Sequence, residues 1–135
     1  MQYRTQPDGS VSITEIEDIF KAHQNRPKAE QIKLVTITGA STITGYKPPI
    51  YEIAALAHRY GAKMFADVCQ LIQHERVDMH ADDHPCHLDF VAFSGHKIYA
   101  SYEPIPLIIF VLQSLSLLRT ENEKSRFSST FYEKK

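Results

Sequence analysis

Two stretches of sequence, KMFADVCQ at residues 63–70 and LDFVAFSGHK at residues 88–97, decide the fold. Each begins with an apolar run of strand length and ends in polar side chains. Asp67 closes the first run, with the amide of Gln70 three residues further on, and the second run opens into the polar residues 94–97. We therefore expect two buried strands, each followed by chemically useful side chains.

A helix is predicted immediately before the first of these strands. Pro48 and Pro49 stand where a helix start tolerates a missing amide hydrogen, and Gly61 lies where a left-handed C-terminal cap belongs. Between them a stripe of apolar residues recurs at helical spacing: Ile50, Ile53, Ala54, Leu56, Ala57 and Tyr60.

A shorter helix and a further strand are expected nearer the N-terminus. Thr14 and Glu17 fit a capping box at the start of this helix, which ends at residues 25–27. Residues 33–38 are strand-like, and residues 39–45 are rich in Gly, Ser and Thr and predict a loop. The apolar face of the short helix consists of Ile16, Ile19 and Phe20.

This order of elements predicts an α/β fold. Strand, helix and strand are followed by a polar loop over residues 73–87 and then by another strand. Such alternation is typical of a mainly parallel sheet with crossover helices that cover both faces. Ligands of open parallel sheets bind beyond the carboxyl ends of the strands. Asp67 and residues 94–97 both fall there.

Composition places the chain among soluble globular proteins with a single core. The length is 135 residues, with 43% hydrophobic and 23% charged residues, which suits one domain. A formal net charge of -1 gives no electrostatic reason to expect a nucleic acid or an anionic membrane as partner. The two cysteines, Cys69 and Cys86, form no disulfide framework, and no secretory signal is visible. We therefore expect a cytoplasmic protein.

The side chains at the two strand ends suit pyridoxal 5'-phosphate (PLP). This cofactor needs an amine for its aldehyde, an anion for its pyridine nitrogen, and hydroxyl or imidazole groups for its phosphate. The arrangement resembles the class V aminotransferases, the family that includes cysteine desulfurases. In that family the cofactor lysine is the last residue of the motif Ser-x-His-Lys. A strand that ends in Asp-x-x-Gln comes before this motif in the sequence. The resemblance extends from about Asp8 to Ala100 and implies a fragment of the large domain of a fold-type-I PLP-dependent transferase.

The resemblance implies a role for each polar residue. Lys97 would form the Schiff base with the cofactor and move protons at the substrate carbon. Asp67 would pair with the pyridinium nitrogen, and Gln70 would hydrogen-bond the phenolic oxygen. Ser94 and His96 would donate to the phosphate. Their structural alternatives are a strand-end helix cap for Asp67, a surface amide for Gln70, and local backbone partners for Ser94 and His96.

Two nearby residues complete the candidate site. Thr42 occupies a place where relatives often carry asparagine, which makes it a further cofactor-binding candidate, although it has no amide. Cys69 follows the same strand as Asp67, and we interpret it as a packing residue rather than a carrier of sulfur.

The character of the sequence changes after Ala100. Residues 105–118 are nearly all apolar, and residues 119–135 are charged and rich in serine. The apolar run is shorter than the roughly 20 residues that a membrane helix needs, so no membrane span is expected. We predict a partial PLP-binding domain over residues 1–100 and a divergent tail over residues 101–135.

The resulting hypothesis is a fragment of an aminotransferase or a cysteine desulfurase-like enzyme. Its small-molecule substrate would be an amino acid, and the complete protein would form a homodimer. We expect the chain alone to be inactive. The alternative is an inactive remnant or a binding module with a metal site in the polar loop.

That alternative rests on a cluster of histidine and cysteine residues in the loop, because both are good zinc ligands. Their spacing matches no usual zinc pattern, and a solvated loop is the simpler interpretation. The cluster consists of His74, His80, His84, Cys86 and His87, with Asp82 and Asp83 between them.

Overall fold

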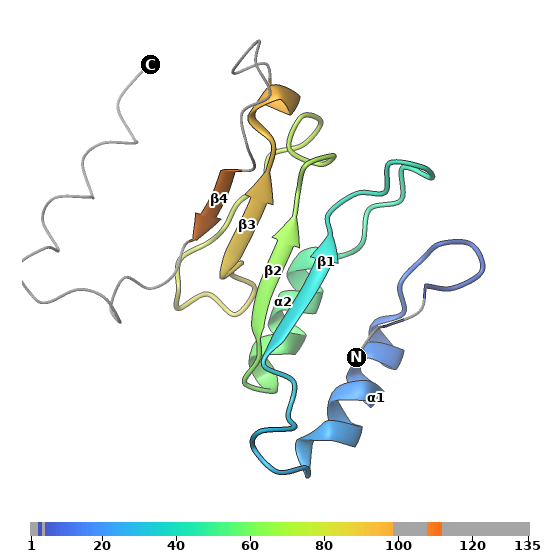
Figure 1. The fold of residues 1–135 in the computed structure, drawn as a ribbon, viewed down its shortest axis with the longest axis vertical. Coiled ribbons are helices and arrows are strands. Elements are labelled where there is room, and N and C mark those ends of the chain that lie inside the picture. Colours follow the sequence, from blue (N-terminus) through green and yellow to red (C-terminus); the bar gives the residue numbers. More distant parts are fainter. Residues whose placement is uncertain (1–2, 4, 99–107, 112–135) are drawn as a thin grey trace, which may run out of the picture.

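The computed structural model describes residues 3, 5–98 and 108–111 and shows a four-stranded sheet with the order β1-β2-β3-β4. One α-helix precedes the first strand, and a second lies between the first two strands in sequence (Figure 1). The elements are α1 (Ile13–Gln24), β1 (Leu34–Thr38), α2 (Ile50–Arg59), β2 (Lys63–Asp67), β3 (Phe90–Phe93), the 3₁₀ helix η1 (Gly95–Ile98) and β4 (Ile108–Val111).

The sheet confirms the predicted fold class. Strands β1, β2 and β3 pair in parallel, whereas β4 pairs antiparallel with β3, so that Phe93 lies opposite Ile108. Residues 73–87 contain neither helix nor strand, as expected of the polar loop. Strand β4 lies inside the apolar run 105–118, and the remainder of that run falls outside the described residues. The division of the chain at Ala100 therefore stays a prediction.

Helix α2 carries the main hydrophobic contact of the molecule. Its predicted stripe is buried except for Tyr60, which follows the helix and is partly buried. Ile53 and Ala54 are completely inaccessible, and α2 packs on β2, whose Met64 and Ala66 are also inaccessible. Figure 1 shows α2 lying across one face of the sheet. The expected cover on both faces is not found in the described part of the chain, where Leu34 remains 46% exposed. Gly61 adopts a φ of 72°, the left-handed conformation expected of the residue that ends this helix.

Helix α1 packs beside α2 through stacked rings, with 4.9 Å between the centroids of Phe20 and Tyr60. The predicted capping box was wrong, because Ser12 and not Thr14 caps the helix: the Ser12 hydroxyl accepts a hydrogen bond from the Glu15 amide at 3.3 Å. The Ser12 amide donates to the Tyr3 hydroxyl instead of to a glutamate. Tyr3, a residue outside the helix, therefore sets the helix start.

Neither described helix has the length and apolarity that a bilayer span needs.

The packing of α2 predicts a large difference between two isoleucines. Ile53→Ala should lower the free energy of unfolding by about 2–5 kcal/mol, because it leaves a cavity between α2 and the sheet. Ile43→Ala removes a side chain that is 92% exposed and should change stability by less than about 0.5 kcal/mol. Urea denaturation followed by circular dichroism measures both; equal effects of the two substitutions would contradict the packing described here.

Candidate functional site

The predicted site residues lie at the carboxyl ends of the parallel strands. Asp67 is the last residue of β2, Ser94 directly follows β3, and Lys97 lies in η1. Because β2 and β3 are parallel neighbours, their ends meet at one edge of the sheet (Figure 1). The Lys97 amide donates to the Ser94 carbonyl at 3.0 Å, which fixes the turn between the two residues.

Cys69 connects the two strand ends. Its amide donates to Asp67 Oδ1 at 3.0 Å, and its Sγ lies 3.6 Å from Ser94 Oγ. Burial raises the pKa of the Cys69 thiol, which therefore stays protonated at neutral pH. Cys69 thus contacts Asp67 through its backbone amide and Ser94 through its uncharged side chain.

The loop after β1 approaches the same edge through Gly39. The Gly39 amide donates to the Asp67 carbonyl at 2.7 Å. A Cβ on Gly39 would lie 3.1 Å from Leu71 Cδ2, so a residue without a side chain allows this close approach. Ser41 shapes the loop beyond, because its hydroxyl accepts from the amides of Ile43 and Thr44 at 3.2 Å each.

A cavity of about 940 Å³ extends from α1 and the N-terminal residues before it along β1 to this loop and the end of β2. Three of the predicted residues line it: Thr42, Asp67 and Gln70. Ser94 and Lys97 are not among the lining residues, and the side chain of His96 lies outside the described part of the structure. Asp67 is exposed, and the Cys69 amide donates to its Oδ1. A carboxylate oxygen therefore remains available to a ligand at this edge.

Sequence reasoning missed a buried carboxylate at the opposite end of the sheet. Asp89, just before β3, is 3% exposed. Its Oδ2 accepts hydrogen bonds from the Met64 amide and from His58 Nε2, both at 2.8 Å. Its Oδ1 lies 2.6 Å from Lys63 Nζ and 3.4 Å from His87 Nε2. The only signal in the sequence was an acidic residue inside an otherwise apolar run.

These partners keep Asp89 ionised. Burial alone would raise the pKa of this carboxyl, but the hydrogen bonds from Lys63, His58 and the Met64 amide outweigh it and lower the pKa to about 2. Asp89 therefore ties the start of β2, helix α2 and the start of β3 together through one negative charge.

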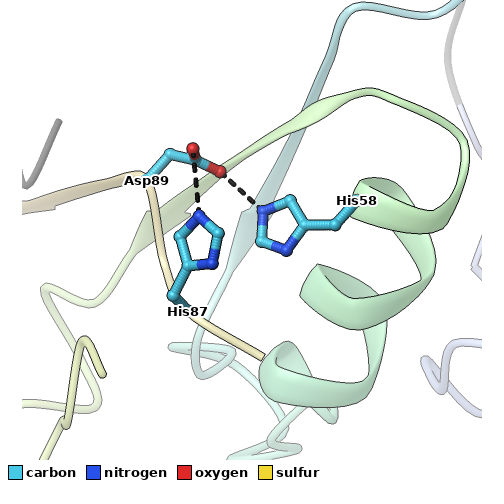
Figure 2. A group of neighbouring side chains, drawn as sticks. All are labelled: His58, His87 and Asp89. Carbon is cyan, nitrogen blue, oxygen red and sulfur yellow. Dashed lines mark hydrogen bonds and ion pairs between the residues drawn. The ribbon is translucent and has the colours of Figure 1, made fainter. Parts of the chain in front are cut away.

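The histidines and cysteine of the polar loop do not form the metal cluster considered from the sequence. His80 and His84 stack on each other with 4.4 Å between ring centroids, and the Cys86 amide donates to His84 Nδ1. His74 is exposed. His87 instead turns toward Asp89 and stacks on His58 of α2, with 4.0 Å between ring centroids (Figure 2).

Comparison with known proteins gives consistent results. Residues 4–102 match the family model described as aminotransferase class-V. Among curated proteins, a cysteine desulfurase of Shigella sonnei is 37% identical over 93 residues and one of Escherichia coli O8 is 36% identical over 93 residues. Both alignments cover 69% of this chain and 20% of the relative. The chain thus spans about a fifth of the length of these relatives.

Solved structures agree on the fold. A cysteine desulfurase from Thermococcus onnurineus NA1 superposes with a TM-score of 0.66 at 23% identity, over 84% of this chain and 25% of that one. A NifS-like protein from Rickettsia africae superposes with a TM-score of 0.61 at 25% identity, over 77% of this chain and 26% of that one.

The contacts of Asp89 predict a stability effect with a defined pH dependence. Asp89→Asn should lower the free energy of unfolding at pH 7 by about 3 kcal/mol, the low end for a broken buried ion pair, since Lys63 is half-exposed. The folded-state pKa of about 2 lies below the ordinary value of 3.8. The stabilisation by the carboxylate is therefore complete above about pH 4 and is lost as the pH falls toward 2.

Denaturation of the parent and the variant between pH 2 and pH 7 measures this effect. Asp83→Asn, in the exposed part of the polar loop, is the matched control and should change stability by less than about 0.5 kcal/mol. A difference between parent and Asp89→Asn that stays constant down to pH 2 would be inconsistent with a charge-dependent role.

Proposed function

Because this chain belongs to the class-V aminotransferase family, we propose that it forms part of a PLP site in an enzyme that acts on an amino acid. The observation that supports this most is the contact of Cys69 with both Asp67 and Ser94, which holds the two strand ends together beside the cavity. The relatives at 36–37% identity are cysteine desulfurases, so cysteine is the substrate to test first.

The donor groups at this edge fit the cofactor. An exposed carboxylate, an amine and a hydroxyl group follow adjacent parallel strands, beyond which ligands of open α/β sheets bind. The cavity lined by Asp67 and Gln70 has room for a ligand of this size. When bound, PLP supplies an electron sink for the bonds at the α carbon of an amino acid.

Each predicted site residue of this chain would then have its own role toward the cofactor or the substrate. Lys97 provides the amine that holds the cofactor and accepts or returns a proton at the substrate α carbon. Asp67 provides the negative charge that keeps the ring nitrogen protonated. Ser94 and His96 donate hydrogen bonds to the phosphate, and Gln70 donates its amide hydrogen to the ring oxygen.

Thr42 and Cys69 would have minor parts in this site. The exposed Thr42 lines the cavity and can offer only a short hydroxyl to a ligand. Cys69 is a poor candidate for a sulfur carrier, because its raised pKa disfavours the thiolate that such chemistry needs. A homodimer is part of the same proposal and concerns the whole protein.

The proposal predicts which lysine binds the cofactor. In the protein as its gene encodes it, borohydride reduction in the presence of PLP should fix the label on Lys97, and peptide mapping by mass spectrometry identifies the residue. Lys97→Arg keeps the positive charge and should abolish labelling, whereas Lys28→Arg, at an exposed position, should not change it. A label on Lys63, or on no lysine, would show that Lys97 is not the residue that binds the cofactor.

A second prediction separates Asp67 from cofactor binding. Asp67→Asn should keep the label on Lys97 and lower turnover of cysteine or another amino acid by about 100-fold or more, since a preorganised charge is lost. Asp82→Asn, in the exposed loop, is the matched control and should retain full turnover. If Asp67→Asn turns over substrate nearly as fast as the parent protein, the proposed role at the ring nitrogen is wrong. The Asp67 carboxylate of the parent would then have only its contact with the Cys69 amide.

A further inference from the structure

Three side chains at the other end of the sheet have the arrangement of metal ligands. His58 belongs to α2, and His87 and Asp89 lie just before β3 (Figure 2). Their ligand atoms all lie within 4.8 Å of one another, and no other such group occurs among the residues that the structure describes. The three side chains are largely buried, with exposures of 18%, 14% and 4%.

Each imidazole ring is oriented by a hydrogen bond to a backbone carbonyl oxygen. His58 Nδ1 lies 2.8 Å from the Pro85 carbonyl oxygen, and His87 Nδ1 lies 2.7 Å from the His84 carbonyl oxygen. A carbonyl only accepts hydrogen bonds, so each Nδ1 carries its hydrogen. The nitrogen that remains for another ligand is Nε2 in each ring, and both Nε2 atoms face the Asp89 carboxylate. Metal-binding histidines are commonly held by just such a hydrogen bond from the other nitrogen.

The orientation of the rings leaves three ligand atoms for one cation. In a metal-bound form each ring is neutral, with its hydrogen on Nδ1, so that both Nε2 lone pairs and the Asp89 carboxylate are available to the same ion. The two rings stack with 4.0 Å between their centroids and 15° between their planes, and both turn Nε2 toward Asp89.

We propose that His58, His87 and Asp89 bind Zn²⁺, with water as the fourth ligand. Two imidazoles and one carboxylate are a usual zinc set with tetrahedral geometry. At zinc–ligand distances of about 2.0–2.1 Å, neighbouring ligand atoms of a tetrahedron are about 3.3 Å apart. The 3.4 Å between His87 Nε2 and Asp89 Oδ1 already matches this spacing. His58 Nε2 lies 2.8 Å from the other carboxylate oxygen, Oδ2, and a small rotation of the carboxylate or the ring brings all three ligand atoms, which lie within 4.8 Å of one another, to one ion.

Lys63 is the competitor of the metal. Its Nζ lies 2.6 Å from Asp89 Oδ1, but its side chain is 55% exposed and can turn to solvent when the ion binds. The bound ion would then link α2 to the strand that leads into Ser94 and Lys97, which gives the site a structural role.

Zinc titration of the metal-free 135-residue chain by isothermal titration calorimetry tests the proposal, with dialysis and elemental analysis for stoichiometry. One zinc ion per chain is expected. His58→Gln and Asp89→Asn should each weaken binding by more than about 100-fold, beyond the loss usual for residues that only support a ligand. His74→Gln removes an exposed histidine of the loop and should bind as the parent does.

Lys63→Met provides a second arm that keeps all three proposed ligands. Loss of the competing ammonium should tighten zinc binding roughly threefold or more. Replacement of zinc by Co²⁺ should give the visible absorption of a tetrahedral N/O site without a thiolate band. No zinc binding by the folded chain, a thiolate band, or loss of binding in Cys86→Ser or His80→Gln instead of His58→Gln would overturn the proposal.

Discussion

Strand β2 is hydrogen-bonded in parallel on both of its edges, and the position of almost every other element depends on this pairing. Its alternate residues Met64 and Ala66 are inaccessible beneath α2, so the register cannot slip by one residue without turning these side chains to the opposite face. The same register brings Asp67 level with the end of β1 and beside the end of β3. The register of β2 therefore determines both the packing of the core and the position of the polar site.

Local patterns were sufficient to predict the elements that this strand organises. The stripe of α2 and the glycine after it are readable because they depend on residues a few positions apart. The start of α1 could not be predicted from local patterns, since Ser12 and Thr14 are both good caps and the distant Tyr3 decides between them. Cover on the second face of the sheet was expected from topology alone, and the described residues supply none.

The two polar regions differ in how far the sequence could predict them. Asp67 and Gln70 follow a strand directly, so a strand assignment and the rule for parallel sheets placed them together at one edge. Asp89 has partners 31 residues earlier in His58 and 25 residues earlier in the Met64 amide. Such pairing depends on how α2 crosses the sheet, which periodicity does not reveal. The bridge from Cys69 to Ser94 was invisible for the same reason.

The two polar regions lie at opposite ends of one short strand. From Lys63 to Asp67, at about 3.3 Å per residue, the strand spans roughly 13 Å, beyond the distance of about 7–10 Å within which substitutions usually couple. Changes at sites this far apart usually act additively. The end that holds Asp89 can therefore vary in charge, and even in the ions it attracts, with little effect on the electrostatics at Asp67. Thermodynamic independence of this kind lets one sheet carry two chemically distinct ends, so that a change of charge at one leaves the other unaffected.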